Sequence, residues 1–159
     1  MLKIGSAMDI HRLVPNRKLI LGGVELKSKV GSLAHSDGDV VYHAICEAII
    51  GALGLGDLGD HFPSSNQKYK NYDSSKFVIE TNKLLKSKKY KINNLDVSII
   101  LESPKLGSTK LLIKKNIAKL LNLKLDQVNV KAGTMEKIGE IGKNKAVLAF
   151  ATVLIMKEG

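Results

Sequence analysis

Residues 37–53, DGDVVYHAICEAIIGAL, form the stretch that decides the fold. After residue 39 this stretch is apolar almost all round, and an apolar run of this length predicts a buried α-helix. Ser36 precedes the run and Asp39 follows three positions later, which is the spacing of a capping box at a helix start. We therefore expect a helix inside the molecule, with Ser36 as its N-cap.

The patterns on both sides of this helix predict a mixed α/β protein. Residues 2–11 alternate in polarity like a strand, and the apolar runs of 18–27 flank Gly22-Gly23 like a hairpin. Residues 54–72 are rich in Gly, Asp, Ser and Asn and predict a loop. Further elements are expected as helices over 74–87 (capped by Asp73 or Ser74) and 108–122, and as strands over 95–102, 127–132 and 146–156. This order predicts an α/β (α+β) sandwich, one mixed β-sheet with helices packed on one face, and we expect 1–159 to be a single domain.

Composition limits the partners that this chain can have. Its net charge is +10, made with 23 Lys and only 2 Arg. Nucleic-acid readers rely on the planar fork of Arg, so we expect no nucleic-acid partner and a small anionic substrate instead. No run reaches the ~18 apolar residues of a membrane helix, so no membrane partner is expected. A single cysteine, Cys46, allows no internal disulfide, and we expect a cytoplasmic protein, or a plastid protein if a leader was removed.

Three side chains predict a metal site. Asp9 and His11 lie two positions apart on a strand, so both point to the same face. His43 lies in the apolar helix, in line with Asp39 and Glu47 at spacings of four residues. A carboxylate and two imidazoles form a ligand set for a divalent metal such as zinc, with a fourth position left open for catalysis. The two carboxylates on the helix are expected to orient the imidazole of His43.

Two loop segments carry weaker signals. Residues 54–59, GLGDLG, match the G-x-G-x-x-G fingerprint, but they follow a helix, whereas a dinucleotide site needs a strand before the glycines. We therefore expect no nicotinamide cofactor, although Asp57 could accept hydrogen bonds from sugar hydroxyls. Residues 131–137, KAGTMEK, follow a predicted strand, where ligands gather in α/β sheets. Their hydroxyl, carboxylate and amides suit phosphate and Mg²⁺, but a plain turn explains the segment equally well.

Six blocks of sequence together point to one family. They are IG at 4–5 with DIHR at 9–12, LGGV at 21–24, AHSDGDVVYHA at 34–44, GDLGDHFP at 56–63, SPKL at 103–106, and NVKA at 129–132 with Thr134, Glu136 and Lys137. In order and spacing, from end to end, the chain resembles the 2-C-methyl-D-erythritol 2,4-cyclodiphosphate synthase family. The block at 34–44 is the most specific of the six.

The resemblance implies a metal-dependent enzyme of the non-mevalonate isoprenoid precursor pathway. In this family the 2-phosphate of 4-diphosphocytidyl-2-C-methyl-D-erythritol 2-phosphate attacks the β-phosphorus, which closes a cyclic diphosphate and expels CMP. The resemblance also implies a homotrimer with active sites at subunit interfaces, and an axial apolar channel for an isoprenoid diphosphate. The implied cofactors are Zn²⁺ or another divalent transition metal, and Mg²⁺ or Mn²⁺.

The resemblance further assigns roles to individual residues. Asp9, His11 and His43 would ligate zinc, and Glu136 would ligate magnesium. His35 and Thr134 would be catalytic, because they position and stabilise the transferring group. The substrate would be bound by Ser36, Asp57, Leu58, Gly59, Phe62, Pro63, Ser64, Ser65, Asn66, Leu101, Glu102, Ser103, Pro104, Lys105, Leu106, Gly107, Gly133, Met135 and Lys143.

Four positions depart from the family pattern. Ser64 and Asn66 stand where acidic residues are usual, and Gly133 stands where Thr is frequent. Lys143 stands where Arg is frequent, which keeps the charge but loses the bidentate fork. We expect these changes to weaken substrate binding and to leave the reaction unchanged.

Three other functions stay open at this point. Another metal-dependent hydrolase of phosphate esters would show a metal site without a preference for cytidine. A catalytically silent binding protein for isoprenoid diphosphates would have no need of intact metal and phosphate residues. A nucleic-acid module would show a salt-dependent mobility shift.

Overall fold

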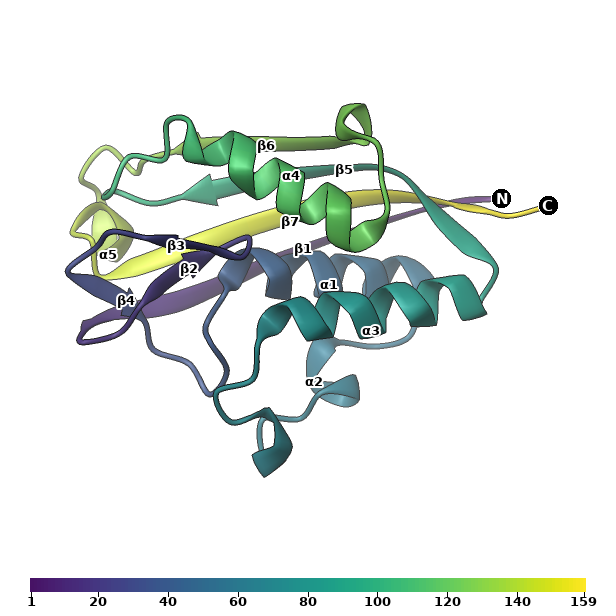
Figure 1. Ribbon diagram of the computed structural model, residues 1–159, viewed down its shortest axis with the longest axis horizontal. Coiled ribbons are helices and arrows are strands. Elements are labelled where there is room, and N and C mark those ends of the chain that lie inside the picture. The colour runs from purple at the N-terminus through teal and green to yellow at the C-terminus, as the bar shows by residue number, and fades with distance from the viewer.

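The most apolar strand lies at the centre of the sheet. The computed structural model, which describes residues 1–159, places β7 (Ala146–Lys157) between β1 (Leu2–Pro15) and β5 (Tyr90–Ile100). Both neighbours pair antiparallel with β7. The edges are β4 (Val30–Ser32), antiparallel to β1, and β6 (Val128–Gly133), parallel to β5. The expectation of one mixed sheet is confirmed, and its strand order is β4-β1-β7-β5-β6 (Figure 1).

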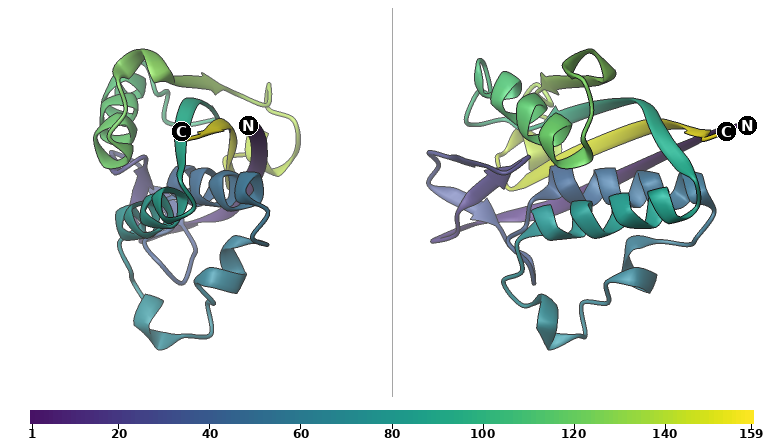
Figure 2. Two further views of the ribbon diagram at one scale, coloured as in Figure 1. Left: turned by 90° about the vertical axis from the view of Figure 1, so that its right-hand side faces the viewer. Right: turned by 45° about the vertical axis from the view of Figure 1, so that its right-hand side comes forward.

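Three long helices cover one face of this sheet. They are α1 (Val40–Leu53), α3 (Ser74–Ser87) and α4 (Thr109–Leu121), and the end-on view places them on the same side of the strands (Figure 2). The backbone of α1 lies so close to β1 that a Cβ atom added at Gly5 would sit 2.0 Å from the carbonyl oxygen of Ala48. This close approach fixes α1, and the residues on it, against the strand that carries Asp9 and His11.

The opposite face of the sheet carries no helix and is largely apolar. Leu2, Ile4, Met8 and Ile10 of β1 and Phe150 of β7 are 41–69% exposed. The odd-numbered residues from Lys3 to Leu13, including Asp9 and His11, form the other, less exposed face of β1, so the predicted alternation is confirmed. We call the five exposed apolar residues the open sheet face. An apolar surface of this kind marks an interaction site.

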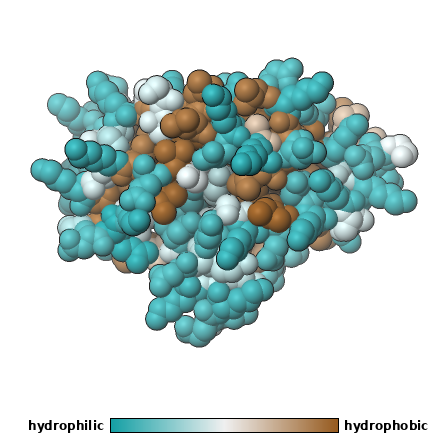
Figure 3. All heavy atoms as spheres, viewed as in Figure 1, coloured by the Kyte–Doolittle hydropathy of each residue, from teal (hydrophilic) through white to brown (hydrophobic).

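Several short elements complete the chain. β2 (Leu19–Leu21) and β3 (Val24–Leu26) form the expected hairpin, and both Gly22 and Gly23 have positive φ, as a type I′ turn requires. The segment expected to be an irregular loop contains α2 (Leu58–His61) and the 3₁₀ turn η1 (Gln67–Tyr69). A second 3₁₀ turn, η2 (Leu125–Gln127), precedes β6, and α5 (Gly139–Gly142) precedes β7. Figure 3 shows that the lower segment around α2 and η1 is almost entirely hydrophilic on this side.

The predicted cap of α1 is wrong by three residues. Asp39, not Ser36, is the N-cap, and its carboxylate accepts hydrogen bonds from the amides of Val41 and Tyr42. Gly38 has a φ of 75°, so the chain turns there and the helix cannot begin earlier. The Ser36 hydroxyl instead accepts a hydrogen bond from the Gly38 amide at 3.2 Å. For α3 the alternative is settled, because Asp73 is the cap.

Strand ends also differ from the expectation. β1 extends four residues further than predicted, to Pro15, because its last three residues pair with β4. β5 begins at Tyr90, five residues early, and an irregularity between Ile92 and Asn94 interrupts the alternation there. None of the helices combines the length and the apolar character that a membrane span needs.

Candidate active site

Three side chains from two elements meet on the helix side of the sheet. Asp9 Oδ2 lies 3.1 Å from His11 Nε2 and 3.2 Å from His43 Nδ1, and the two imidazole nitrogens are 3.1 Å apart. Asp9 and His11 come from β1, and His43 comes from the first turns of α1. The predicted juxtaposition of these three residues, which we call the triad, is confirmed.

The spacing of the triad fits a divalent metal. Zinc binds imidazole nitrogen and carboxylate oxygen at about 2.0–2.1 Å, so neighbouring ligand atoms of a tetrahedral site lie about 3.3 Å apart. The three observed separations are all within a few tenths of this value and form a near-equilateral triangle. A triangle of two nitrogens and one oxygen is one face of a tetrahedron, with the fourth position open to a ligand.

The carboxylate of the triad is ionised, as a metal ligand must be. Burial by itself would raise the pKa of Asp9, but hydrogen bonds and charge attraction from His11 and His43 outweigh it. Together they hold the pKa of that carboxyl well below its usual range. The carboxylate is therefore ionised at neutral pH, as metal binding requires.

The two carboxylates expected to orient His43 serve other groups, so that prediction is wrong. Asp39 accepts hydrogen bonds from the amides of Gly22 (2.9 Å) and Gly23 (2.7 Å), which ties the hairpin to the start of α1. Burial raises the pKa of Asp39 to about 6, against the backbone N–H groups that favour its charged form. Glu47 accepts a hydrogen bond from the amide of Leu58 at 2.8 Å and so anchors α2.

A pocket of about 360 Å³ opens next to the triad. Its lining includes six of the residues assigned to catalysis or substrate binding, namely His35, Ser36, Leu58, Gly59, Phe62 and Ser64. His35 Nε2 is buried and has no hydrogen-bond partner in the chain. Burying a nitrogen without a hydrogen-bond partner costs free energy, so this atom indicates a position where a ligand binds.

Four more predicted residues belong to the same segment and do not line this pocket. Asp57 caps α2, where it accepts a hydrogen bond from the Asp60 amide at 3.0 Å. Asn66 accepts from the Lys68 amide and caps η1. Pro63 and Ser65 are exposed in the turn between α2 and η1.

The remaining predicted residues gather at the ends of the parallel strands β5 and β6. The amide of Leu101 donates to the carbonyl of Gly133 at 3.0 Å, which joins the two loops. Thr134 Oγ1 donates to Glu136 Oε1 at 3.0 Å and accepts from the Glu136 amide. We call this group the loop cluster; it comprises Leu101, Glu102, Ser103, Pro104, Lys105, Leu106, Gly107, Gly133, Thr134, Met135, Glu136 and Lys143.

The part of the loop cluster that follows β6 is exposed, whereas Glu102, after β5, is half-buried. Residues 133–140 are all exposed, and Glu136 has a φ of 50° in the tight turn. Glu102 Oε2 is buried without a partner, and Lys143 Nζ lies 3.6 Å from Glu140 Oε1. Apart from the bond between Thr134 and Glu136, little in the chain fixes the carboxylate expected to bind Mg²⁺.

The structure does not bring the loop cluster to the triad within one chain. Ile10 and Ile100 both pair with Leu148, and Gly133 pairs with Ile100, so these residues form one row across the sheet. Three strand spacings therefore separate the triad strand from Gly133, which is about 14 Å. The chain holds two separate groups of candidate site residues.

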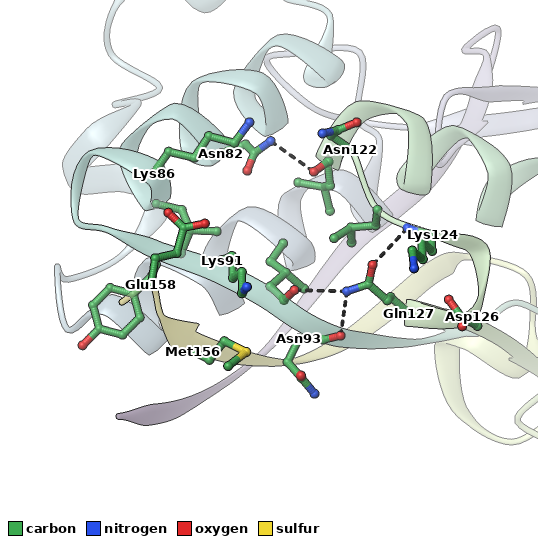
Figure 4. Close-up of a pocket in the computed structure, with 15 residues that line it drawn as sticks. Asn82, Lys86, Lys91, Asn93, Asn122, Lys124, Asp126, Gln127, Met156 and Glu158 are labelled. Atoms are coloured by element: carbon green, nitrogen blue, oxygen red, sulfur yellow. Dashed lines mark hydrogen bonds between the residues drawn. The ribbon is translucent and has the colours of Figure 1, made fainter.

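A larger hollow lies elsewhere and is not the candidate site. Its volume is about 630 Å³, and Lys86, Lys91 and Lys124 line it near the ends of α3 and α4 (Figure 4). Gln127 Nε2 already donates there to the carbonyls of Ile92 and Asn93. The three-residue metal cluster lies beside the smaller pocket, so we place the chemistry there.

The fold and the site together define a class of protein. It is an α/β protein with a half-buried triad of two imidazoles and one carboxylate that could hold a divalent metal and would leave a fourth ligand position open. The chain belongs to the YgbB family, whose model matches residues 2–156.

Named relatives agree with this membership. The 2-C-methyl-D-erythritol 2,4-cyclodiphosphate synthase of Fusobacterium nucleatum is 48% identical over 158 residues, 99% of each chain. The bifunctional enzyme IspD/IspF of Pelagibacter ubique is 45% identical, and the match covers 99% of this chain and 42% of that protein. A solved structure, the CDP complex of IspF from Plasmodium falciparum, superposes with a TM-score of 0.88 at 37% identity, covering 99% of this chain and 97% of that one.

Proposed function

We propose that this protein converts 4-diphosphocytidyl-2-C-methyl-D-erythritol 2-phosphate into 2-C-methyl-D-erythritol 2,4-cyclodiphosphate and CMP, with residues 1–159 acting as one catalytic domain. The observation that carries the proposal is the metal-fitting triad beside a pocket with an unpartnered His35, in a chain related to these synthases over 99% of its length. In the reaction an oxygen of the 2-phosphate bonds to the β-phosphorus, and the bond from that phosphorus to the CMP oxygen breaks.

The triad is the proposed zinc site and Glu136 the proposed magnesium ligand. Imidazole nitrogens suit zinc and oxygen donors suit magnesium, so the two ligand sets divide the work. When bound, the cations would stabilise the charge that develops on the diphosphate oxygens. Phosphoryl transfer needs little covalent help beyond this, because alignment and charge stabilisation supply most of the rate.

The chain's own side chains align the reacting groups in this proposal. His35 offers a buried ring nitrogen to the transferring phosphate, and Ser36 offers its hydroxyl from the same pocket wall. Phe62 and Ser64 also line the pocket and would contact the methylerythritol. Thr134 would hold the phosphate from the loop cluster. Asp57, exposed at the start of α2, is free on one carboxylate oxygen to meet a ribose hydroxyl.

We further propose that the active site is completed between subunits of a homotrimer. Two cations that act on one diphosphate must lie within a few ångströms of each other, whereas about 14 Å separates the two groups within a chain. A loop cluster from a neighbouring copy would supply Glu136 and the cytidine pocket. The open sheet face gives a reason to associate, because five exposed apolar side chains on adjacent strands would be buried.

The test is CMP release from the cytidine-diphosphate substrate, with and without a chelator, with the product followed by phosphorus NMR. Chelator-sensitive CMP release with a cyclic diphosphate signal supports the proposal. A folded, zinc-loaded protein that releases no CMP contradicts it. Hydrolysis of the diphosphate without a cyclic product, or equal activity on simple phosphate esters, would instead favour a metal-dependent hydrolase.

A further inference from the structure

The ring of His43 is held on its far side by a serine hydroxyl, that of Ser74, which lies outside all six blocks of the sequence resemblance. Its Nδ1 faces the other two triad atoms, while its Nε2 lies 2.9 Å from Ser74 Oγ. Ser74 is the first residue of α3 and is completely buried. Because it is buried, its hydroxyl is expected to find its hydrogen-bond partners within the chain.

The second neighbour of Ser74 is a carboxylate that is itself fixed. Ser74 Oγ donates to Asp37 Oδ1 at 2.5 Å, and the Ser74 amide donates to Asp37 Oδ2 at 2.9 Å. The Asp39 amide adds a third bond to Asp37 Oδ1. A carboxylate at the N-terminus of a helix is also favoured by the helix dipole, so this position is strongly determined.

The direction of these bonds follows from the donor inventory. Both oxygens of Asp37 already accept from backbone N–H groups, those of Asp39 and Ser74, and the Ser74 hydroxyl donates its proton to the same carboxylate. The oxygen of Ser74 must then accept, and its closest remaining partner is His43 Nε2, which therefore carries the proton. The lone pair of the neutral ring is left on Nδ1, the atom that faces Asp9 and His11.

We propose that Ser74 and Asp37 are positioning residues for the metal, acting through His43 as a carboxylate–hydroxyl–imidazole chain. This series of hydrogen bonds selects the His43 tautomer that can bind metal through Nδ1, and it fixes the plane of the ring. This proposal rests on the proposed metal site but adds two residues that the proposed function does not assign. Ser36 Oγ lies 3.2 Å from the same nitrogen and accepts from the Gly38 amide, so it is the weaker second acceptor.

Ring packing supports the proposal, because the same imidazole is confined from two other sides. Phe77 of α3 lies with its centroid 6.0 Å from that of His43, and the His11 ring meets it edge-on at 5.2 Å. His43 is only 8% exposed. A ring held this closely has few other orientations, so losing one hydrogen bond should change its tautomer more than its place.

The experiment measures zinc affinity by competition with a chromophoric chelator in the wild type, Ser74→Ala, Asp37→Asn and the control Ser75→Ala. Ser75 is the next residue of α3, is half-buried and makes no side-chain hydrogen bond. Loss of such outer partners typically weakens metal binding 10–100-fold, which is the drop expected for Ser74→Ala and Asp37→Asn. Ser75→Ala should stay within about twofold of the wild type.

A spectroscopic readout separates orientation from a general structural role. In metal-free protein labelled with ¹⁵N-histidine, the wild type should show His43 protonated on Nε2, and Ser74→Ala should show a raised share of the Nδ1–H tautomer. Thermal unfolding of the metal-free variants checks that they fold. Folded Ser74→Ala with wild-type zinc affinity and tautomer overturns this inference and leaves the proposed function standing. A wild type that binds no zinc overturns both.

Discussion

The triad and the loop cluster differ in how the chain holds them. Asp9, His11 and His43 come from a long strand and a buried helix, and each is fixed by contacts within the chain. Glu136 and Thr134 lie in an exposed turn and mainly contact each other. The comparison teaches that one half of the candidate site is preorganised in a single chain, whereas the other half has few contacts of its own and, in the proposed trimer, would be held by a neighbouring subunit.

The largest expected effect is on the zinc content and the activity of variants in the two halves of the candidate site. His43→Ala should remove the tightly bound zinc and lower CMP release by about 10³-fold or more, because it deletes a ligand. Glu136→Gln should lower CMP release by about 10²-fold yet keep the zinc, because it removes only a charge on the exposed loop. Elemental analysis and a CMP assay on both variants check this, and loss of zinc from Glu136→Gln would contradict the division.

The next effect tests the rigidity of the triad's support. Asp39→Ala leaves the amides of Gly22 and Gly23 without acceptors in a buried site, so it should lower the free energy of unfolding by about 3 kcal/mol. Asp57→Ala removes an exposed cap and should cost about 1 kcal/mol. Urea unfolding of the metal-free proteins compares them. Equal losses would mean that α1 is no better anchored than α2.

A smaller effect concerns pH. The pKa of Asp9 is depressed in the folded state, so the unfolded state binds more protons there and the stability contributed by the carboxylate is present above its unfolded pKa. The stability difference between metal-free wild type and Asp9→Asn should therefore be fully present above about pH 5 and shrink as the pH falls through about 4 toward 3. Urea unfolding across this pH range measures the stability difference. A difference that grows as the pH falls would contradict a lowered pKa of Asp9.

The smallest effect concerns a departure from the family pattern. Ser64 lines the pocket at a position where the family resemblance leads us to expect an acidic residue. Ser64→Asp should lower KM by a few-fold with kcat nearly unchanged, because it adds uniform binding. Ser65→Asp, in the exposed turn beside it, is the matched control. If KM is the same in Ser64→Asp and the wild type, Ser64 is not a cause of weak substrate binding.

Much of the fold could be predicted from periodicity alone. Strand β1, helices α1, α3 and α4 and the Gly22-Gly23 hairpin have strong local patterns, and an i, i+2 strand spacing predicts that Asp9 and His11, two members of the triad, share one face. Strand β4 and helices α2 and α5 have three or four residues each, which is too short for a periodic pattern in the sequence. Such short elements depend on tertiary contacts, so the sequence did not predict them.

Sequence spacing could not predict the hydrogen-bond partners that lie far apart in the sequence. Asp39 and Glu47 share a helical stripe with His43, yet their carboxylates are taken up by the hairpin and by Leu58. Ser74, which does contact His43, lies 31 residues away in sequence. The separation of the two halves also depends on strand order, which places β7 and β5 between β1 and β6.

The most direct test of the account mixes two inactive proteins. His43→Ala has an intact loop cluster and Glu136→Gln has an intact triad, so each homotrimer should be inactive, but a site formed by the triad of one and the loop of the other is whole. Random 1:1 reassembly after unfolding should restore about one quarter of the wild-type CMP release, since about three quarters of trimers are mixed and each has one whole site in three. Activity no greater than that of the separate variants would contradict a site shared between chains.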